Sequence, residues 1–149
     1  MLNSYLDDGY SDHEKCEVTI IGGLYEQNRK GGLTPAYGAH DTYYNVTVQD
    51  NAQYGIGMVG GVAFEEGGIG GQTIAHACLS RYNKVNYYVS GAGGTGGHPN
   101  WLTLIKCSSH LATEVGYSAQ VDGILDAYEC TDLGSPQAKQ EVSNGVVNV

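Results

Sequence analysis

Glycine occurs in clumps along this chain, between short runs that have the composition of β-strands. Twenty-three of the 149 residues are glycine, roughly twice the usual share. The clumps include Gly22-Gly23, Gly60-Gly61 and the stretches 67–71 and 91–97. Because glycine lacks a Cβ, it favours turns, bulges and sheet corners and disfavours long helices. The spacing therefore predicts an all-β chain.

Alternation of apolar and polar residues predicts about eight strands. Residues 42–49 alternate most clearly, with Tyr44, Val46 and Val48 on one face. The other predicted strands are 16–21, 53–64, 73–82, 85–90, 101–107, 114–121 and 123–130. Turn residues between them predict hairpins at 50–51, 83–84 and 122–123, the last being a dipeptide favoured in type I′ turns. We therefore expect a single-domain antiparallel β-sandwich, jelly-roll-like, with glycine-rich loops.

The ends of the chain are more polar than its centre. Residues 1–15 are acidic and predict an N-terminal arm, residues 16–131 the β-sandwich domain, and residues 132–149 a C-terminal tail. In the tail, Ser135 and Pro136 are residue types that begin a helix, and Asn144-Gly145 are types that end one. The tail is therefore predicted to form a short helix. No internal repeat and no second domain are apparent.

The charge balance excludes several classes of partner. The net charge is −9, from 16 acidic and seven basic residues, so there is no basic stripe to neutralise phosphates. We expect no nucleic-acid partner. No apolar run is long enough to span a bilayer, and the first fifteen residues lack the basic and apolar regions of a signal peptide. We therefore expect that the chain does not insert into a membrane and that it is synthesised in a cytoplasm.

No motif for catalysis, a cofactor or a metal stands out. Residues 55–60 and 91–96 match G-x-G-x-x-G, but neither segment leads into a helical pattern, as a dinucleotide site requires. The histidines and cysteines are not paired at metal-ligand spacings. The sequence thus predicts no cofactor, no metal site, no catalytic residue and no enzymatic activity. We expect the four cysteines to be buried free thiols; disulfides are the alternative if the chain ends outside a cell.

The candidate contact surface lies around the longest glycine-rich loop, residues 91–100, which leads into Trp101. A glycine loop of this length costs conformational entropy to order, so a partner is expected to hold it. A sugar stacking on the aromatic residues is one such partner, and a neighbouring subunit is another. Trp101 as an ordinary core residue is the alternative. The residues assigned to the surface are Tyr87, Tyr88, His98, Asn100 and Trp101.

An acidic, tyrosine-rich β-domain without an export signal fits a protein that packs against copies of itself. The sequence therefore favours a structural protein of a self-assembling particle, and specifically a bacteriophage virion component, as a capsid decoration (cement) protein or a tail-fibre protein. Its partners would be copies of itself and other virion proteins, and its location the virion after synthesis in the host cytoplasm. The alternative is an extracellular, lectin-like adhesin that binds carbohydrate through residues 91–101.

Overall fold

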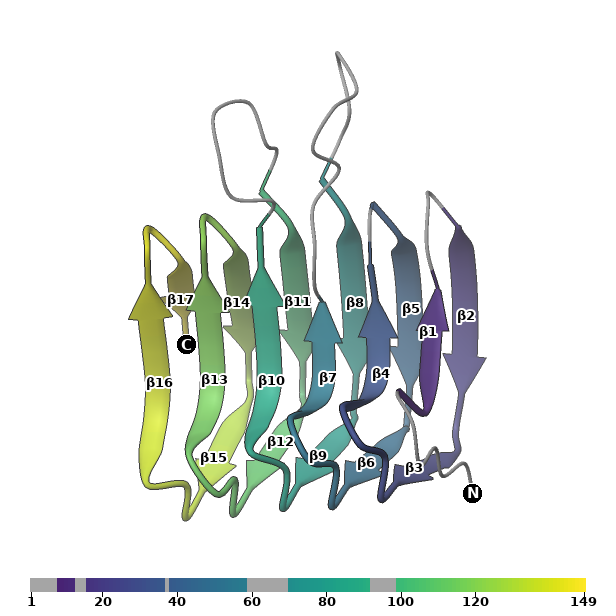
Figure 1. The fold of residues 1–149 in the computed structure, drawn as a ribbon, viewed down its shortest axis with the longest axis horizontal. Coiled ribbons are helices and arrows are strands. Elements are labelled where there is room, and N and C mark those ends of the chain that lie inside the picture. The colour runs from purple at the N-terminus through teal and green to yellow at the C-terminus, as the bar shows by residue number, and fades with distance from the viewer. Residues whose placement is uncertain (1–7, 13–15, 37, 59–69, 92–98) are drawn as a thin grey trace.

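In the computed structural model, the chain forms a solenoid with three parallel β-sheets (Figure 1). The structure describes residues 8–12, 16–36, 38–58, 70–91 and 99–149. These residues contain seventeen strands and no helix, and every strand pairing among them is parallel. The architecture is that of a parallel β-helix.

Each turn of the solenoid, here called a coil, adds one strand to each sheet. The front sheet contains β1 (Tyr10–Asp12), β4 (Gly31–Pro35), β7 (Tyr54–Met58), β10 (Val85–Ser90), β13 (Val115–Gln120) and β16 (Gln137–Val142). The back sheet contains β2 (Glu17–Ile21), β5 (His40–Tyr44), β8 (Gln72–His76), β11 (Trp101–Ile105), β14 (Ile124–Tyr128) and β17 (Val146–Asn148). The short base sheet contains β3 (Leu24–Glu26), β6 (Thr47–Gln49), β9 (Leu79–Arg81), β12 (Ser108–His110) and β15 (Thr131–Leu133).

Outside two insertions, the coils repeat every 22 or 23 residues, which overturns the expectation of no internal repeat. Asn28 and Asn51, which are hydrogen-bonded to each other in adjacent coils, are 23 residues apart. The step lengthens to 32 residues between Asn51 and Asn83, and to 29 between Cys78 and Cys107. The extra residues fall between a front strand and the following back strand, where residues 59–71 and 91–100 connect them. Two insertions of unequal length break the period in the sequence.

The corners of the solenoid are formed by residues in the left-handed backbone region. Every corner between a back and a base strand carries a positive φ, at Gly22 and Gly23 in the first corner and then at Asn45, Ala77, Lys106 and Glu129. Every corner between a base and a front strand carries another, at Gln27, Asp50, Tyr82, Leu111 and Gly134. For most of these residue types this conformation is unfavourable. Backbone hydrogen bonds to the next coil offset the cost: the Ala77 N–H donates to the Ile105 carbonyl at 2.9 Å.

Apolar side chains fill the interior in columns that run along the solenoid. One column is Leu33, Ile56, Tyr87 and Tyr117, all at most 1% exposed. The residue before each of these also faces inward, at the crowded base–front corner. Glycine is needed there in most coils, since a Cβ at Gly55 would lie only 2.6 Å from the Asn86 carbonyl oxygen. This packing requirement accounts for several glycines that the sequence suggests are loop residues.

The expected antiparallel jelly-roll sandwich of about eight strands is wrong, although the chain is all-β. Alternation with a period of two is the same in parallel and antiparallel strands, so it identified strands without revealing their partners. The predicted hairpin turns at 50–51, 83–84 and 122–123 lie at corners between consecutive strands of different sheets. The predicted C-terminal helix is also wrong, because Gln137–Val142 pairs with β13 as strand β16. Ser135 instead hydrogen-bonds Asp132, at 2.6 Å.

Both ends of the chain contribute strands to the solenoid. Within the expected arm, β1 pairs with β4, and the Asp8 carboxylate accepts a hydrogen bond from the Gly31 N–H at 2.7 Å. Within the expected tail, β16 and β17 extend the front and back sheets. The described part of the chain includes no helix that is long and apolar enough to cross a membrane.

Candidate functional site

The structure places the sequence-predicted contact residues on different parts of the solenoid. Tyr87 is fully buried, and its hydroxyl donates to the carbonyls of Cys78 and Ser108, at 3.1 and 3.0 Å. Asn100 is also fully buried; its Oδ1 accepts from the Gly71 N–H at 2.9 Å and its Nδ2 donates to the Ser90 carbonyl at 2.6 Å. Both side chains therefore hold neighbouring segments of the fold.

The remaining predicted residues do not form one surface. Trp101 begins β11 in the back sheet and Tyr88 lies in β10 of the front sheet, and both are partly exposed positions that alternate with buried ones. His98 lies outside the described residues. Among these residues, Tyr88 lines a cavity in the described part of the chain.

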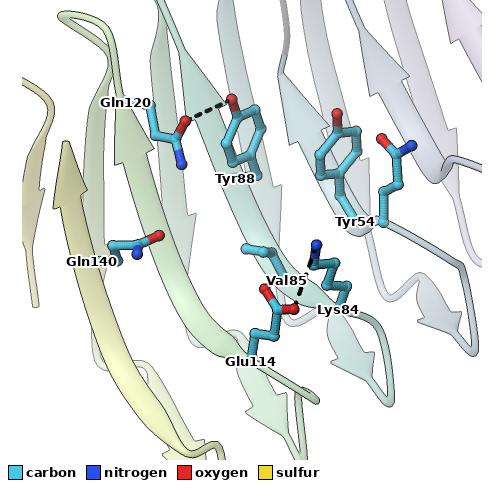
Figure 2. A pocket seen from close by; sticks show the side chains of 8 residues that line it. Tyr54, Lys84, Val85, Tyr88, Glu114, Gln120 and Gln140 are labelled. Atoms are coloured by element: carbon cyan, nitrogen blue, oxygen red, sulfur yellow. Dashed lines mark hydrogen bonds and ion pairs between the residues drawn. The ribbon is translucent and has the colours of Figure 1, made fainter. Parts of the chain in front are cut away.

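That cavity is a shallow groove on the outer surface of the front sheet, with a volume of about 280 Å³. Figure 2 shows the Tyr88 phenol and the Gln120 amide together at one end, and the Lys84–Glu114 ion pair at the other. The side chains that line the groove are Gln53, Tyr54, Lys84, Val85, Tyr88, Glu114, Gln120 and Gln140. They come from four consecutive coils, so the groove runs along the solenoid.

A stacked tyrosine pair forms one wall of the groove. The rings of Tyr54 and Tyr88 lie 4.8 Å apart with an interplanar angle of 13°. The stack depends on Gly57, which pairs with Tyr88: a Cβ at Gly57 would lie 2.8 Å from the Tyr54 ring. The Tyr54 ring thus takes the space of a side chain at position 57. Such stacking contributes about 0.5–1.5 kcal/mol beyond the burial of area, and burial raises the pKa of Tyr54.

A small residue, Ser118, lies between Tyr88 and Gln140 in the next coil and pairs with both. Ser118 is fully buried, and its hydroxyl donates a hydrogen bond of 3.4 Å to Gln140 Oε1. Gln120 and Gln140 line the groove with their amide groups (Figure 2). The groove therefore offers one aromatic ring face together with amide donors and acceptors.

The groove carries no net charge. Its charged residues are Lys84 and Glu114, whose charged atoms lie 3.4 Å apart with side chains 50% and 56% exposed. A pair this exposed contributes little to stability, about 0–1 kcal/mol. Its side chains are therefore free to reorient toward a ligand at small cost.

The outer surface of the back sheet, here called the back face, has a different character. Its exposed large apolar side chains are Ile21, Tyr44, Ile74, Tyr128 and Val146, with exposed fractions from 37% to 77%. Trp101, Ile105 and Ile124 are partly buried among them. The only carboxylates at outward positions of the described back strands are Glu17 and Asp126. For a chain with a net charge of −9, this face is nearly uncharged.

The interior holds titratable groups that belong to the packing. Asp12 and Asp41 are 8% and 1% exposed, and Tyr43 donates a hydrogen bond of 2.5 Å to Asp41. Burial, followed by the charge of Asp41, raises the pKa of Asp12 to about 7. A paired carboxyl and carboxylate can share one proton in such a site. Their burial keeps both groups away from a substrate.

Three of the four cysteines, Cys78, Cys107 and Cys130, form a column along the solenoid. All four are free, but the expectation that all are buried is wrong: Cys78 and Cys107 are buried, Cys130 is partly buried and Cys16 is exposed. Backbone N–H groups of Cys78 and Cys107 donate to the sulfur of the next coil, at 3.4 and 3.3 Å. Among the described residues, no group of three histidine, cysteine or acidic side chains is placed to hold a metal ion.

No protein-family model, curated protein or solved structure matches this chain. The groove residues Tyr54, Gln120 and Gln140 were not singled out by sequence reasoning. Aligning the coils would have placed Gly57, Tyr88, Ser118 and Gln140 in one column. The two insertions conceal that alignment.

Proposed function

We propose that the protein is a non-enzymatic structural component of a self-assembling particle, and that it assembles through the back face. The observation that carries the proposal is the patch of exposed apolar side chains on the outer back sheet, nearly free of charge on a strongly acidic chain. Contiguous exposed apolar patches of a few hundred Å² on soluble proteins are often functional. Like-charged copies repel one another least where they present an uncharged surface, so the occupant that fits this face is a second copy.

The size of the back face sets the strength of the contact. The back sheet has six strands spaced about 4.8 Å apart, and each strand has about five residues with a rise of about 3.3 Å per residue. The product of this width and length is an area of about 400 Å². Two such faces would bury about 800 Å², below the roughly 1,200–2,000 Å² of stable standard interfaces. We therefore expect weak, concentration-dependent pairing, which repetition within a particle strengthens through avidity.

A bacteriophage virion is the particle that we propose, with the protein acting as a tail-fibre or capsid decoration component. A stack of coils presents the same flat surface at each level, which suits lateral packing of rods (Figure 1). Its partners would then be copies of itself and other virion proteins, and it would be made in the host cytoplasm.

Sedimentation velocity across a concentration series tests the proposal. The wild-type chain is expected to form oligomers as concentration rises. Tyr128→Lys places a charge in the back face at a side chain that is 57% exposed, and should raise the dissociation constant at least about tenfold. Leu133→Lys is the matched control, because Leu133 is 56% exposed but ends a base strand.

Two results would contradict this assignment. One is a wild-type chain that stays monomeric at every concentration. The other is an equal loss of assembly in Tyr128→Lys and Leu133→Lys, which would mean that added positive charge, rather than the back face, controls association.

A further inference from the structure

We infer that the groove on the front sheet binds a neutral oligosaccharide, with one pyranose ring stacked on Tyr88. This site is separate from the back face, and its ligand is a different class of molecule. It also differs from the loop around residues 91–101, because Trp101 lies on the opposite sheet.

The first argument is the aromatic surface. Tyr54 stacks on one face of the Tyr88 ring, which fixes the ring in place before any ligand binds. The Tyr88 ring also lines the groove, together with Val85, Gln120 and Gln140. A pyranose has an apolar face made of C–H groups, and an aromatic ring that is held rigid can receive that face at little entropic cost.

The second argument is the kind of polar group around this ring. Gln120 and Gln140 each carry an amide with two donors and one acceptor, which is the combination that adjacent sugar hydroxyls require. The Tyr88 hydroxyl lies 3.5 Å from Gln120 Oε1, so this contact is long and can be exchanged for one to a ligand hydroxyl. An aliphatic ligand would displace water from the amide N–H groups without offering acceptors in its place, which argues against a purely apolar ligand.

The third argument is charge and size. The positive charge of Lys84 is balanced by Glu114 at 3.4 Å, in a chain whose net charge is −9. An anionic ligand would be repelled by the chain as a whole. A volume of about 280 Å³ lies just below the range of ligand pockets, roughly 300–1,000 Å³, and suits one or two sugar units rather than a large ligand.

Isothermal titration calorimetry with a panel of neutral tetrasaccharides tests the inference. The panel contains cellotetraose, maltotetraose and chitotetraose in N-acetylated form, with tetragalacturonate as the anionic comparison. We expect at least one neutral sugar to bind with a dissociation constant of about 1 mM or lower. Tyr88→Ala should weaken this binding at least about tenfold, whereas Tyr88→Phe keeps the ring and should stay within about threefold.

A second variant and a matched control separate the groove from other surfaces. Gln140→Ala removes an amide without touching the tyrosine stack, and should weaken binding about threefold to tenfold. Tyr128→Ala removes an exposed tyrosine from the back face and should leave sugar binding unchanged. Tyr128→Ala also alters the assembly surface. If it weakens assembly and leaves sugar binding unchanged, the two proposals are tested separately. Circular dichroism confirms that each variant keeps its β-structure.

Several outcomes would overturn the inference. They are the absence of binding by every neutral sugar at about 10 mM, preferential binding of tetragalacturonate, and binding that survives Tyr88→Ala. The single tryptophan, Trp101, provides one more readout from the opposite sheet. Sugar binding that changes its fluorescence and is unaffected by Tyr88→Ala would place the ligand near residues 91–101 instead.

Discussion

Asn83 connects two coils through a fully buried amide, and its replacement by alanine gives a sharp test of this fold. Its Oδ1 accepts from both the backbone N–H and the Nδ2 of Asn51, each at 2.9 Å. Its Nδ2 donates to the Val48 carbonyl at 3.2 Å, and to Ser80 Oγ and Asn86 Oδ1, both at 3.0 Å. The side chain thus satisfies polar groups in three strands and one corner at once.

The expected cost follows from the groups that Asn83→Ala leaves behind. The Asn51 backbone N–H and Asn86 Oδ1 both lose their Asn83 partner inside the protein. Each buried polar group left without a partner costs about 1–3 kcal/mol, so the variant should lose about 2–6 kcal/mol. Typical domains have a free energy of unfolding of about 5–15 kcal/mol, so the loss would be a large fraction of the total.

Urea unfolding followed by circular dichroism measures this loss as a shift of the midpoint. Asn148→Ala is the control, because its side chain makes an exposed hydrogen bond to Asp126, at 2.7 Å. That variant should cost less than about 0.5–1 kcal/mol. If the free energy of unfolding of Asn83→Ala lies within about 0.5 kcal/mol of that of the control, the buried hydrogen bonds of Asn83 do not stabilise the coils as we argue.

Three further predictions concern other positions in the coils. Gly55→Ala should destabilise the protein by about 1–3 kcal/mol or more in urea unfolding, because its Cβ would lie 2.6 Å from a buried backbone oxygen; an unchanged midpoint would contradict the inward orientation of this residue. The pKa of Asp12 is raised to about 7, so its contribution to stability is greatest below about pH 4 and is lost as the pH rises through about 7. Asp12→Asn should therefore raise the melting temperature more at about pH 8 than at about pH 4, and an equal gain at both would refute the shift. Iodoacetamide should label the exposed Cys16 before the buried Cys78 and Cys107, as followed by peptide mass spectrometry; simultaneous labelling of all three would show that the column is open to solvent.

Strand positions could be read from the sequence where alternation was strong. Residues 85–90 form β10 with the predicted bounds, and the predicted strand 16–21 contains β2. Two segments that the sequence predicts as single strands each form two strands, and these belong to different sheets. Residues 42–49 turn at Asn45, and residues 73–82 turn at Ala77, both with positive φ. Alanine gives no sequence signal for this conformation, so the second corner could not be foreseen.

The candidate groove could be predicted only in part. Tyr88 was singled out because tyrosines are common on contact surfaces, and it lines the groove. Gln120 and Gln140 reach the same groove from β13 and β16, which lie beside β10 in order. Recognising them required the register between coils, in which Ser118 pairs with both Tyr88 and Gln140.

The sequence by itself determined that this chain is all-β and acidic, because glycine spacing, alternation and charge act locally and can be counted along the chain. Only the tertiary structure decided that the strands are parallel and stack in coils of 22 or 23 residues outside the two insertions. The physical reason is that a strand has the same period of two whatever its neighbour. The corners determine which strand lies beside which, and hydrogen bonds to the next coil stabilise them. One example is the Lys106 N–H, which donates to the Tyr128 carbonyl at 2.9 Å. Such bonds stabilise a left-handed residue of almost any type, and so leave little trace in the amino-acid sequence.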